Sequence, residues 1–207
     1  MASSREDILA RVRAGLGSDP AQADAKRRAA LDHLAARAQG PRPALAGDAQ
    51  ARFRARAEAM SSTVDTVACG AELPAAIARY LAAGGLAPRA VCWEEFGALD
   101  WAAAGLTVEP RAARGDDLVG ISGAFCAIAE TGTLMLLSGP QTAATTSLLP
   151  ETHIAIVRAS RIVAGMEDGF RLLRAERGAL PRAVNFVSGP SRTGDIEQTI
   201  VLGAHGP

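Results

Sequence analysis

The chain has 207 residues, with 22 basic and 22 acidic side chains and a hydrophobic content of 48%. This length allows one domain, or one domain with an appendage, and the balanced charge without a dense basic stretch gives no electrostatic case for nucleic-acid binding. No apolar stretch approaches the length of a membrane span, and the acidic N-terminus lacks an apolar signal core. We therefore expect a cytoplasmic protein with no membrane partner.

Cysteine and lysine usage excludes several classes of chemistry. Cys69, Cys92 and Cys126 are far apart and form no CxxC pair, so we expect no zinc or iron–sulfur site built by this chain. Lys26 is the one lysine among the 22 basic residues, and it lies in a charged helical stretch. P-loop, pyridoxal-phosphate and lysine-aldolase chemistry each need a placed lysine, and no GxGxxG motif supports a Rossmann-type NAD site.

Residues 1–60 are predicted to form a helical arm. Helices are expected over 4–16, 21–38 and 48–60, with a linker containing proline and glycine before the third. These helices carry too few large apolar residues for a core of their own. We expect the arm to pack on the main domain or on a second copy of the chain, which would make the protein a homo-oligomer.

Residues 61–207 are predicted to form an α/β domain, which begins with alternating strands and helices. The expected elements are a strand over 63–68, a helix over 73–83, a strand over 89–93, a short helix over 96–103 and a strand over 106–109. Strands that alternate with helices indicate βαβ units and a largely parallel, Rossmann-like sheet.

The second half of this domain departs from the alternation. The apolar runs 125–129 and 134–137 are separated by a tight connection, which predicts an antiparallel hairpin. Further strands are expected over 154–157 and 184–187, on either side of a helix over 168–177. The predicted fold class is therefore α/β, with a mostly parallel sheet and an antiparallel part.

Two polar, glycine-marked segments follow buried strands, and both are candidate sites. The first is Ala129-Glu130-Thr131-Gly132-Thr133, and the second runs from Ser188 to Gln198. Polar residues clustered with glycine at strand ends are where open α/β sheets usually hold ligands. A turn alone does not need Glu, Thr, Ser, Arg and Asp together, so the pattern predicts a site.

Glu130 is the first candidate for chemistry, as a general acid or base or as a substrate-positioning group. The alternative is that it accepts backbone hydrogen bonds that hold the turn. In the second segment, backbone N–H groups and Arg192 would bind an anion, whereas capping by Ser191 or Thr193, with Arg192 bridging to Asp195, is the structural alternative. The nearby acids favour a small carboxylate, or a polar network with Glu130, over a phosphate.

His153 and His205 are candidate proton acceptors, or metal ligands together with Glu130, Asp195 or Glu197; a hydrogen-bonded structural role is the alternative, and we expect no metal site. Ser138-Gly139-Pro140 and Thr145-Thr146-Ser147 would line a pocket wall or form plain loops. The predicted catalytic residues are Glu130 and His205. The predicted substrate-binding residues are Thr131, Gly132, Thr133, Gly189, Ser191, Arg192, Thr193, Asp195 and Glu197.

Three blocks in this order, residues 120–133, 148–157 and 188–207, resemble the LUD-domain family and, within it, the lactate-utilisation protein C branch. They span roughly residues 115–207, just under half of the chain. The resemblance implies a fold related to CoA transferases, ribose-5-phosphate isomerase and glucosamine-6-phosphate deaminase. It also implies a role in oxidising L-lactate to pyruvate with iron–sulfur lactate-utilisation proteins as partners, and no cofactor in this chain.

Three functions are compatible with these residues. The first is an accessory or regulatory subunit of a cytoplasmic L-lactate oxidation system. The second is an independent enzyme of the CoA-transferase or sugar-phosphate isomerase type, since Glu130-Thr131-Gly132 resembles the Glu-x-Gly of CoA transferases. The third is a sensor that binds a small carboxylate. Family members normally continue past His-Gly-Pro into another short strand, whereas this sequence stops at Pro207. We therefore expect the sheet edge near the site to be incomplete.

Overall fold

The computed structural model describes residues 4–17, 19–38, 40–42, 44, 47–190, 192–193 and 201–202, of which 20, 192–193 and 201–202 are described by their backbone alone. The chain divides into two compact units, Met1–Ala44 and Leu45–Pro207.

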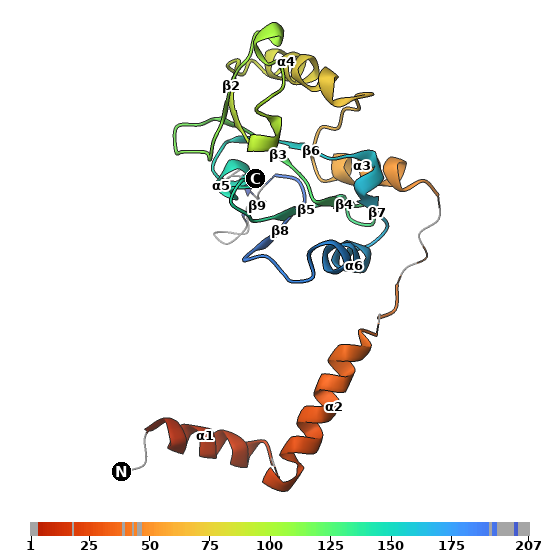
Figure 1. Ribbon diagram of the computed structural model, residues 1–207, viewed down its shortest axis with the longest axis vertical. Helices are drawn as coiled ribbons and strands as arrows, with labels where there is room; N and C mark the ends of the chain where they lie inside the picture. Colours follow the sequence, from red (N-terminus) through yellow and green to blue (C-terminus); the bar gives the residue numbers. More distant parts are fainter. Residues whose placement is uncertain are drawn as a thin grey trace. The chain divides into compact units, whose positions relative to one another are not determined.

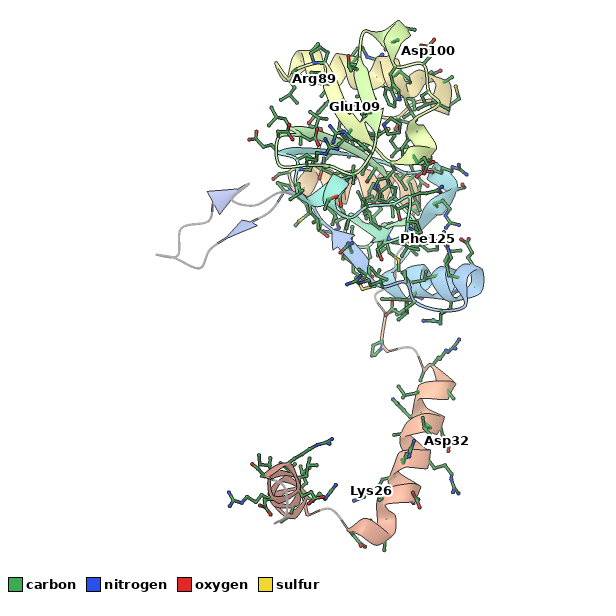
Figure 2. All side chains as sticks on the ribbon, turned by 60° about the vertical axis from the view of Figure 1, so that its left-hand side comes forward. Lys26, Asp32, Arg89, Asp100, Glu109 and Phe125 are labelled. Atoms are coloured by element: carbon green, nitrogen blue, oxygen red, sulfur yellow. The ribbon has the colours of Figure 1, made fainter. Side chains whose placement is uncertain are left out.

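The first unit contains the helices α1 (Ser4–Gly15) and α2 (Ala23–Ala36), and it agrees with the first two predicted helices. Neither helix has a buried side chain. Figure 2 labels Lys26 and Asp32, two of the charged side chains that project from α2. The stripe of large apolar residues is too narrow to build a core within this unit, as the sequence predicts.

The second unit begins with helix α3 (Ala49–Ala59), whose first turn is capped by Asp48. The Asp48 carboxylate accepts hydrogen bonds from the backbone N–H groups of Gln50 and Ala51, which lack partners within the helix. Phe53 and Ala57 are buried against strand residues of the same unit. The sequence analysis grouped this helix with the arm and drew the boundary after residue 60, whereas the compact units divide after Ala44.

The described part of the chain then contains ten strands, eight of which form two four-stranded sheets; Figure 1 labels the strands of both sheets except β1. The first sheet has the order β2-β1-β3-β6 and every pair in it is parallel: β1 (Arg89–Cys92), β2 (Thr107–Pro110), β3 (Val119–Gly123) and β6 (Thr152–Ile156). The second has the order β7-β4-β5-β8: β4 (Cys126–Ile128), β5 (Thr133–Leu137), β7 (Ile162–Val163) and β8 (Val184–Val187). Strands β9 (Arg192–Thr193) and β10 (Val201–Leu202) pair with each other, antiparallel.

Helix α4 (Leu73–Ala83) builds the core of the parallel sheet. Its residues Ile77 and Leu81 pack with Cys92, Val119 and Ile121 from the sheet. The short helix α5 (Thr145–Leu148) lies against β3 and β6, where the main-chain oxygen of Thr146 occupies the space that a Cβ at position 120 would need.

Helices α3 and α6 (Met166–Arg177) cover opposite faces of the second sheet, as the labels in Figure 1 show. Alternate residues along β4 point to opposite faces, so Cys126 packs with Leu173 of α6 while Ala127 packs with Phe53 of α3. Gly169 lets α6 approach closely, since a Cβ there would lie 3.3 Å from the sulfur of Cys126. The predicted α/β class with parallel and antiparallel parts is confirmed.

Two predicted elements are absent from the structure. Residues 63–67 form no strand, and the carbonyl of Val64 accepts a hydrogen bond from Arg54, at 2.6 Å. In place of the predicted helix over 96–103 there are two 3-10 turns, Glu94–Phe96 and Ala102–Ala104.

Candidate functional site

The carboxyl ends of β1, β3 and β6 lie at the same edge of the parallel sheet, because neighbouring strands in it run in one direction. From β1 the chain first adds β2 on one side and then β3 and β6 on the other. The strand order therefore reverses between β1 and β3. In open α/β sheets, ligands bind in the crevice outside the carboxyl ends at such a reversal.

A cavity of about 700 Å³ opens at this edge. It is lined by residues that follow β1, β3, β5 and β6, and by the end of α6. We call it the carboxyl-edge cavity. Its charged lining residues are Glu95, Arg158, Arg161, Glu176 and Arg177. The predicted wall segment Ser138-Gly139-Pro140 also lines it, whereas Thr145-Thr146-Ser147 does not.

Arg161 has a structural role at the rim of this cavity. Its Nε donates to the carbonyl of Phe125 at 2.8 Å, and its two terminal nitrogens bind both carboxylate oxygens of Glu176. Its guanidinium carbon also lies 4.5 Å from the centre of the Phe125 ring (labelled in Figure 2). The hydrogen bonds from Arg161 lower the pKa of Glu176, so this pair remains ionised and ties α6 to the start of β4.

Arg158 and Arg177 are the remaining cations of the cavity. Both are exposed, and neither has a hydrogen bond or ion pair with another residue in the described part of the chain. Arg158 comes two residues after the carboxyl end of β6, and Arg177 is the last residue of α6. The helix dipole accommodates Arg177, because carbonyl oxygens gather at the C-terminus of a helix. No comparable local feature accounts for Arg158, whose guanidinium has no ionic partner among the described residues.

His153 lies within β6, and its side chain forms a hydrogen bond to the neighbouring strand of the sheet. Its Nε2 is 2.7 Å from the hydroxyl oxygen of Ser122 on the neighbouring strand β3, and that hydroxyl donates to the carbonyl of Gly123 at 3.1 Å. Burial lowers the pKa of His153 from 6.5 to about 4, because desolvation disfavours the imidazolium form. The ring is therefore neutral at physiological pH and shares one hydrogen bond with Ser122 through Nε2. Ser122 is fully buried, which argues against a nucleophilic role for the pair.

The first predicted segment forms the tip of the β4–β5 hairpin and does not line the carboxyl-edge cavity. Its hydroxyls make a short chain: Thr131 Oγ1 lies 2.7 Å from Thr133 Oγ1, which lies 2.5 Å from the Ser188 hydroxyl. The structure thus brings Thr131 and Thr133 together with the start of the second predicted segment. Glu130 is half-buried beside them, and its backbone N–H donates to the carbonyl of Ala164 at 3.0 Å.

Gly132 and Gly189, both predicted as binding residues, press against the C-terminal end of α3. Both have a positive φ, 70° and 72°. A Cβ on Gly132 would lie 2.6 Å from the backbone nitrogen of Ala57, and one on Gly189 would lie 2.1 Å from the carbonyl oxygen of Met60. These contacts explain why both positions carry glycine: the turns need left-handed backbone and a close approach to α3.

The other predicted site residues have no described side chain. Ser191, Asp195, Glu197 and His205 lie outside the described residues, and Arg192 and Thr193 are described only as the backbone of β9. Within the described part of the chain, no group of three or more His, Cys, Asp and Glu side chains is placed to hold a metal ion. In the same part, no helix has the length and apolar character to cross a membrane.

The sequence analysis missed Glu95, Arg158 and Arg177, although a signal existed for the first two. Polar residues that follow a buried strand were taken as site candidates after β4 and β8, and the same rule applies after β1 and β6. Glu95 follows β1 by three residues and Arg158 follows β6 by two. For Arg177, the last residue of α6, no sequence signal exists.

Comparison with known proteins adds a family and a fold. Residues 50–207 match the model of the LUD domain. The chain is 43% identical over 91 residues to lactate utilization protein C of Shouchella clausii, and 40% identical over 92 residues to lactate utilization protein C of Bacillus subtilis. Each match covers 43% of this chain, but only 40% and 38% of the two relatives, so the matched part spans about two-fifths of their length.

A solved structure extends the likeness over most of the chain. The crystal structure of a DUF162 family protein from Deinococcus radiodurans superposes with a TM-score of 0.58 at 27% sequence identity. The superposition covers 77% of this chain and 91% of that one. The α/β architecture with its parallel and antiparallel sheets is thus shared with a solved relative.

Proposed function

Because this chain belongs to the LUD-domain family, we propose that it serves lactate utilisation as an accessory or regulatory subunit of an L-lactate oxidation system. Its relatives in Shouchella clausii and Bacillus subtilis are named lactate utilization protein C, which supports a role in the same process. In this proposal the chain binds a small carboxylate in the carboxyl-edge cavity.

The observation that carries the binding proposal is Arg158. Its guanidinium lines the cavity at the carboxyl end of β6 and has no ionic partner among the described residues. A guanidinium presents a planar fork of N–H donors that matches both oxygens of a carboxylate. Arg161 has its donors occupied by Phe125 and Glu176, so Arg158 and Arg177 are the two cations that remain for a ligand.

We assign electron transfer to separate iron–sulfur partner proteins. A cluster needs several thiolates in one place, whereas Cys92 and Cys126 are buried in the separate cores of the two sheets. Burial also raises the pKa of both thiols to about 11, which opposes thiolate formation. The reaction that this chain assists would then be completed on the partners.

The test is L-lactate-dependent dye reduction by the candidate iron–sulfur partners, with and without this chain. We expect the rate to depend on the chain and to fall about tenfold or more with Arg158→Gln, since the charge-assisted bonds to the carboxylate are lost. Arg89→Gln is the matched control, because Arg89 is an exposed arginine at the opposite, amino end of β1 (Figure 2). Equal rates without the chain would refute the accessory role.

A Glu130→Gln variant in the same assay separates the hairpin tip from the cavity. A large loss with Glu130→Gln and none with Arg158→Gln would move the working site to the hairpin tip, where Glu130, Thr131 and Thr133 lie together. If lactate raises the melting temperature of the chain but no partner turns over, the chain is a sensor.

A further inference from the structure

The carboxyl-edge cavity is also lined by a carboxylate, that of the exposed Glu95. Glu95 belongs to the 3-10 turn directly after β1 and lines the cavity. One of its carboxylate oxygens lies 2.4 Å from the point where a Cβ on Gly123 would stand. The glycine at the carboxyl end of β3 therefore makes room for the carboxylate, which lies in the crevice between β1 and β3 where the strand order reverses.

The two charged groups have opposite requirements for a ligand. Arg158 offers only donors and calls for an anion. Glu95 as a carboxylate offers only acceptors, and it has no hydrogen bond or ion pair with any other described residue. A ligand that binds to both groups carries an anionic group and a hydrogen-bond donor, as a carboxylate with a neighbouring hydroxyl does.

We propose that the cavity is specific for 2-hydroxy carboxylates, with Arg158 binding the carboxylate and Glu95 accepting a hydrogen bond from the 2-hydroxyl group. This assignment rests on the proposed function, which it deepens by naming the group that distinguishes the substrate from its oxidation product. A 2-keto acid presents an acceptor oxygen to Glu95, which is repelled by the carboxylate. An unsubstituted acid presents nothing at that point and leaves Glu95 without a partner.

The size of the cavity extends the proposal from one acid to a class. A volume of about 700 Å³ is far larger than a three-carbon acid needs and lies in the range that holds drug-sized ligands. Leu137 and Ile156 supply apolar wall beside the charged groups. Longer 2-hydroxy acids, such as 2-hydroxybutyrate, are therefore expected to bind alongside L-lactate.

The test is isothermal titration of the full chain with L-lactate, pyruvate and propionate at one pH. For the unmodified chain we expect L-lactate to bind about tenfold or more tightly than either of the other acids, as a hydrogen bond to a charged group predicts. Glu95→Gln should bring the lactate-to-pyruvate ratio near one, because an amide can also donate to a keto oxygen. Glu94→Gln, a change in the same turn outside the cavity lining, should leave the ratio unchanged.

Gly123→Ala provides a second variant that keeps every charge. Its Cβ would displace the Glu95 carboxylate, so we expect weaker lactate binding and unchanged propionate binding. Circular dichroism and the melting temperature check that each variant is folded. A lactate preference that survives both Glu95→Gln and Gly123→Ala would overturn the proposal while leaving the carboxylate site at Arg158 in place.

The outcomes also separate this proposal from the accessory role. If dye reduction needs the chain but no acid binds to it, the specificity proposal is refuted and the accessory role stands. If the partners reduce dye without the chain, yet L-lactate binds in a Glu95-dependent way, the accessory role is refuted and the 2-hydroxy acid site stands.

Discussion

Replacing Gly132 by alanine should destabilise the second unit by about 2–5 kcal/mol, because two separate penalties add at this position. The residue has a φ of 70°, where a Cβ costs about 1–2 kcal/mol. That Cβ would also lie 2.6 Å from the backbone nitrogen of Ala57 and 2.7 Å from the carbonyl carbon of Arg56. Relief of this clash requires a shift of the α3 backbone, for which overpacked cores suggest about 1–3 kcal/mol more.

Gly105→Ala is the matched control, because it isolates the first penalty. Gly105 has a φ of 73°, close to that of Gly132, but its Cβ would meet nothing within 4 Å. We therefore expect Gly105→Ala to cost about 1–2 kcal/mol. The difference between the two variants measures how firmly the hairpin tip is pressed against α3. Gly189→Ala, whose Cβ would lie 2.1 Å from the Met60 carbonyl oxygen, should resemble Gly132→Ala.

The assay is urea denaturation followed by tryptophan fluorescence. Trp93 and Trp101 are the chain's two tryptophans, and both are buried in the second unit, so their emission reports the unfolding of that unit without the arm. Equal losses for Gly132→Ala and Gly105→Ala, within about 0.5 kcal/mol, would show that the hairpin tip does not bear on α3, and the packing argument would be wrong.

Two further predictions concern titratable groups. Burial lowers the pKa of His153 from 6.5 to about 4, so the unfolded chain binds a proton at this residue more readily than the folded chain does. The contribution of neutral His153 to the free energy of unfolding is therefore full above pH 6.5 and is lost as the pH falls through about 4. The loss amounts to at most about 3 kcal/mol. Urea denaturation at several pH values should show that the free energy of unfolding depends less steeply on pH for His153→Gln than for the unmodified chain. An unchanged pH dependence would contradict the lowered pKa of His153. Iodoacetamide at pH 8 should modify Cys69, which is exposed, and spare Cys92 and Cys126, whose pKa is raised to about 11. Peptide mass spectrometry would contradict this if all three thiols react at one rate.

Helix α4, strand β8 and the β4–β5 hairpin were predictable because their signals are local. Helix α4 begins and ends as predicted at Leu73 and Ala83, where two glycines follow, and β8 begins and ends as predicted at Val184 and Val187. The strand predicted over 63–68 failed for the opposite reason. Whether an extended segment becomes a strand depends on a partner, and the carbonyl of Val64 finds its partner in the side chain of Arg54.

The cavity was harder to predict because its charged residues come from distant segments. Glu95, Arg158 and Arg177 follow β1, β6 and the body of α6, and nothing in the sequence indicates that they share a space. The chain also has 21 arginines among its 22 basic residues, so composition does not distinguish Arg158, which has no ionic partner among the described residues, from Arg161, which is bonded to Glu176.

The sequence by itself determined the α/β class, the antiparallel hairpin and the polar residues at strand ends, because periodicity and turn residues act over short distances. Only the tertiary structure decided which strand ends face one cavity, which arginine is already paired, and that Gly132 and Gly189 serve the packing of α3. These features depend on the order of strands in the sheets and on contacts between residues far apart in the chain. They are therefore fixed only when the elements pack together.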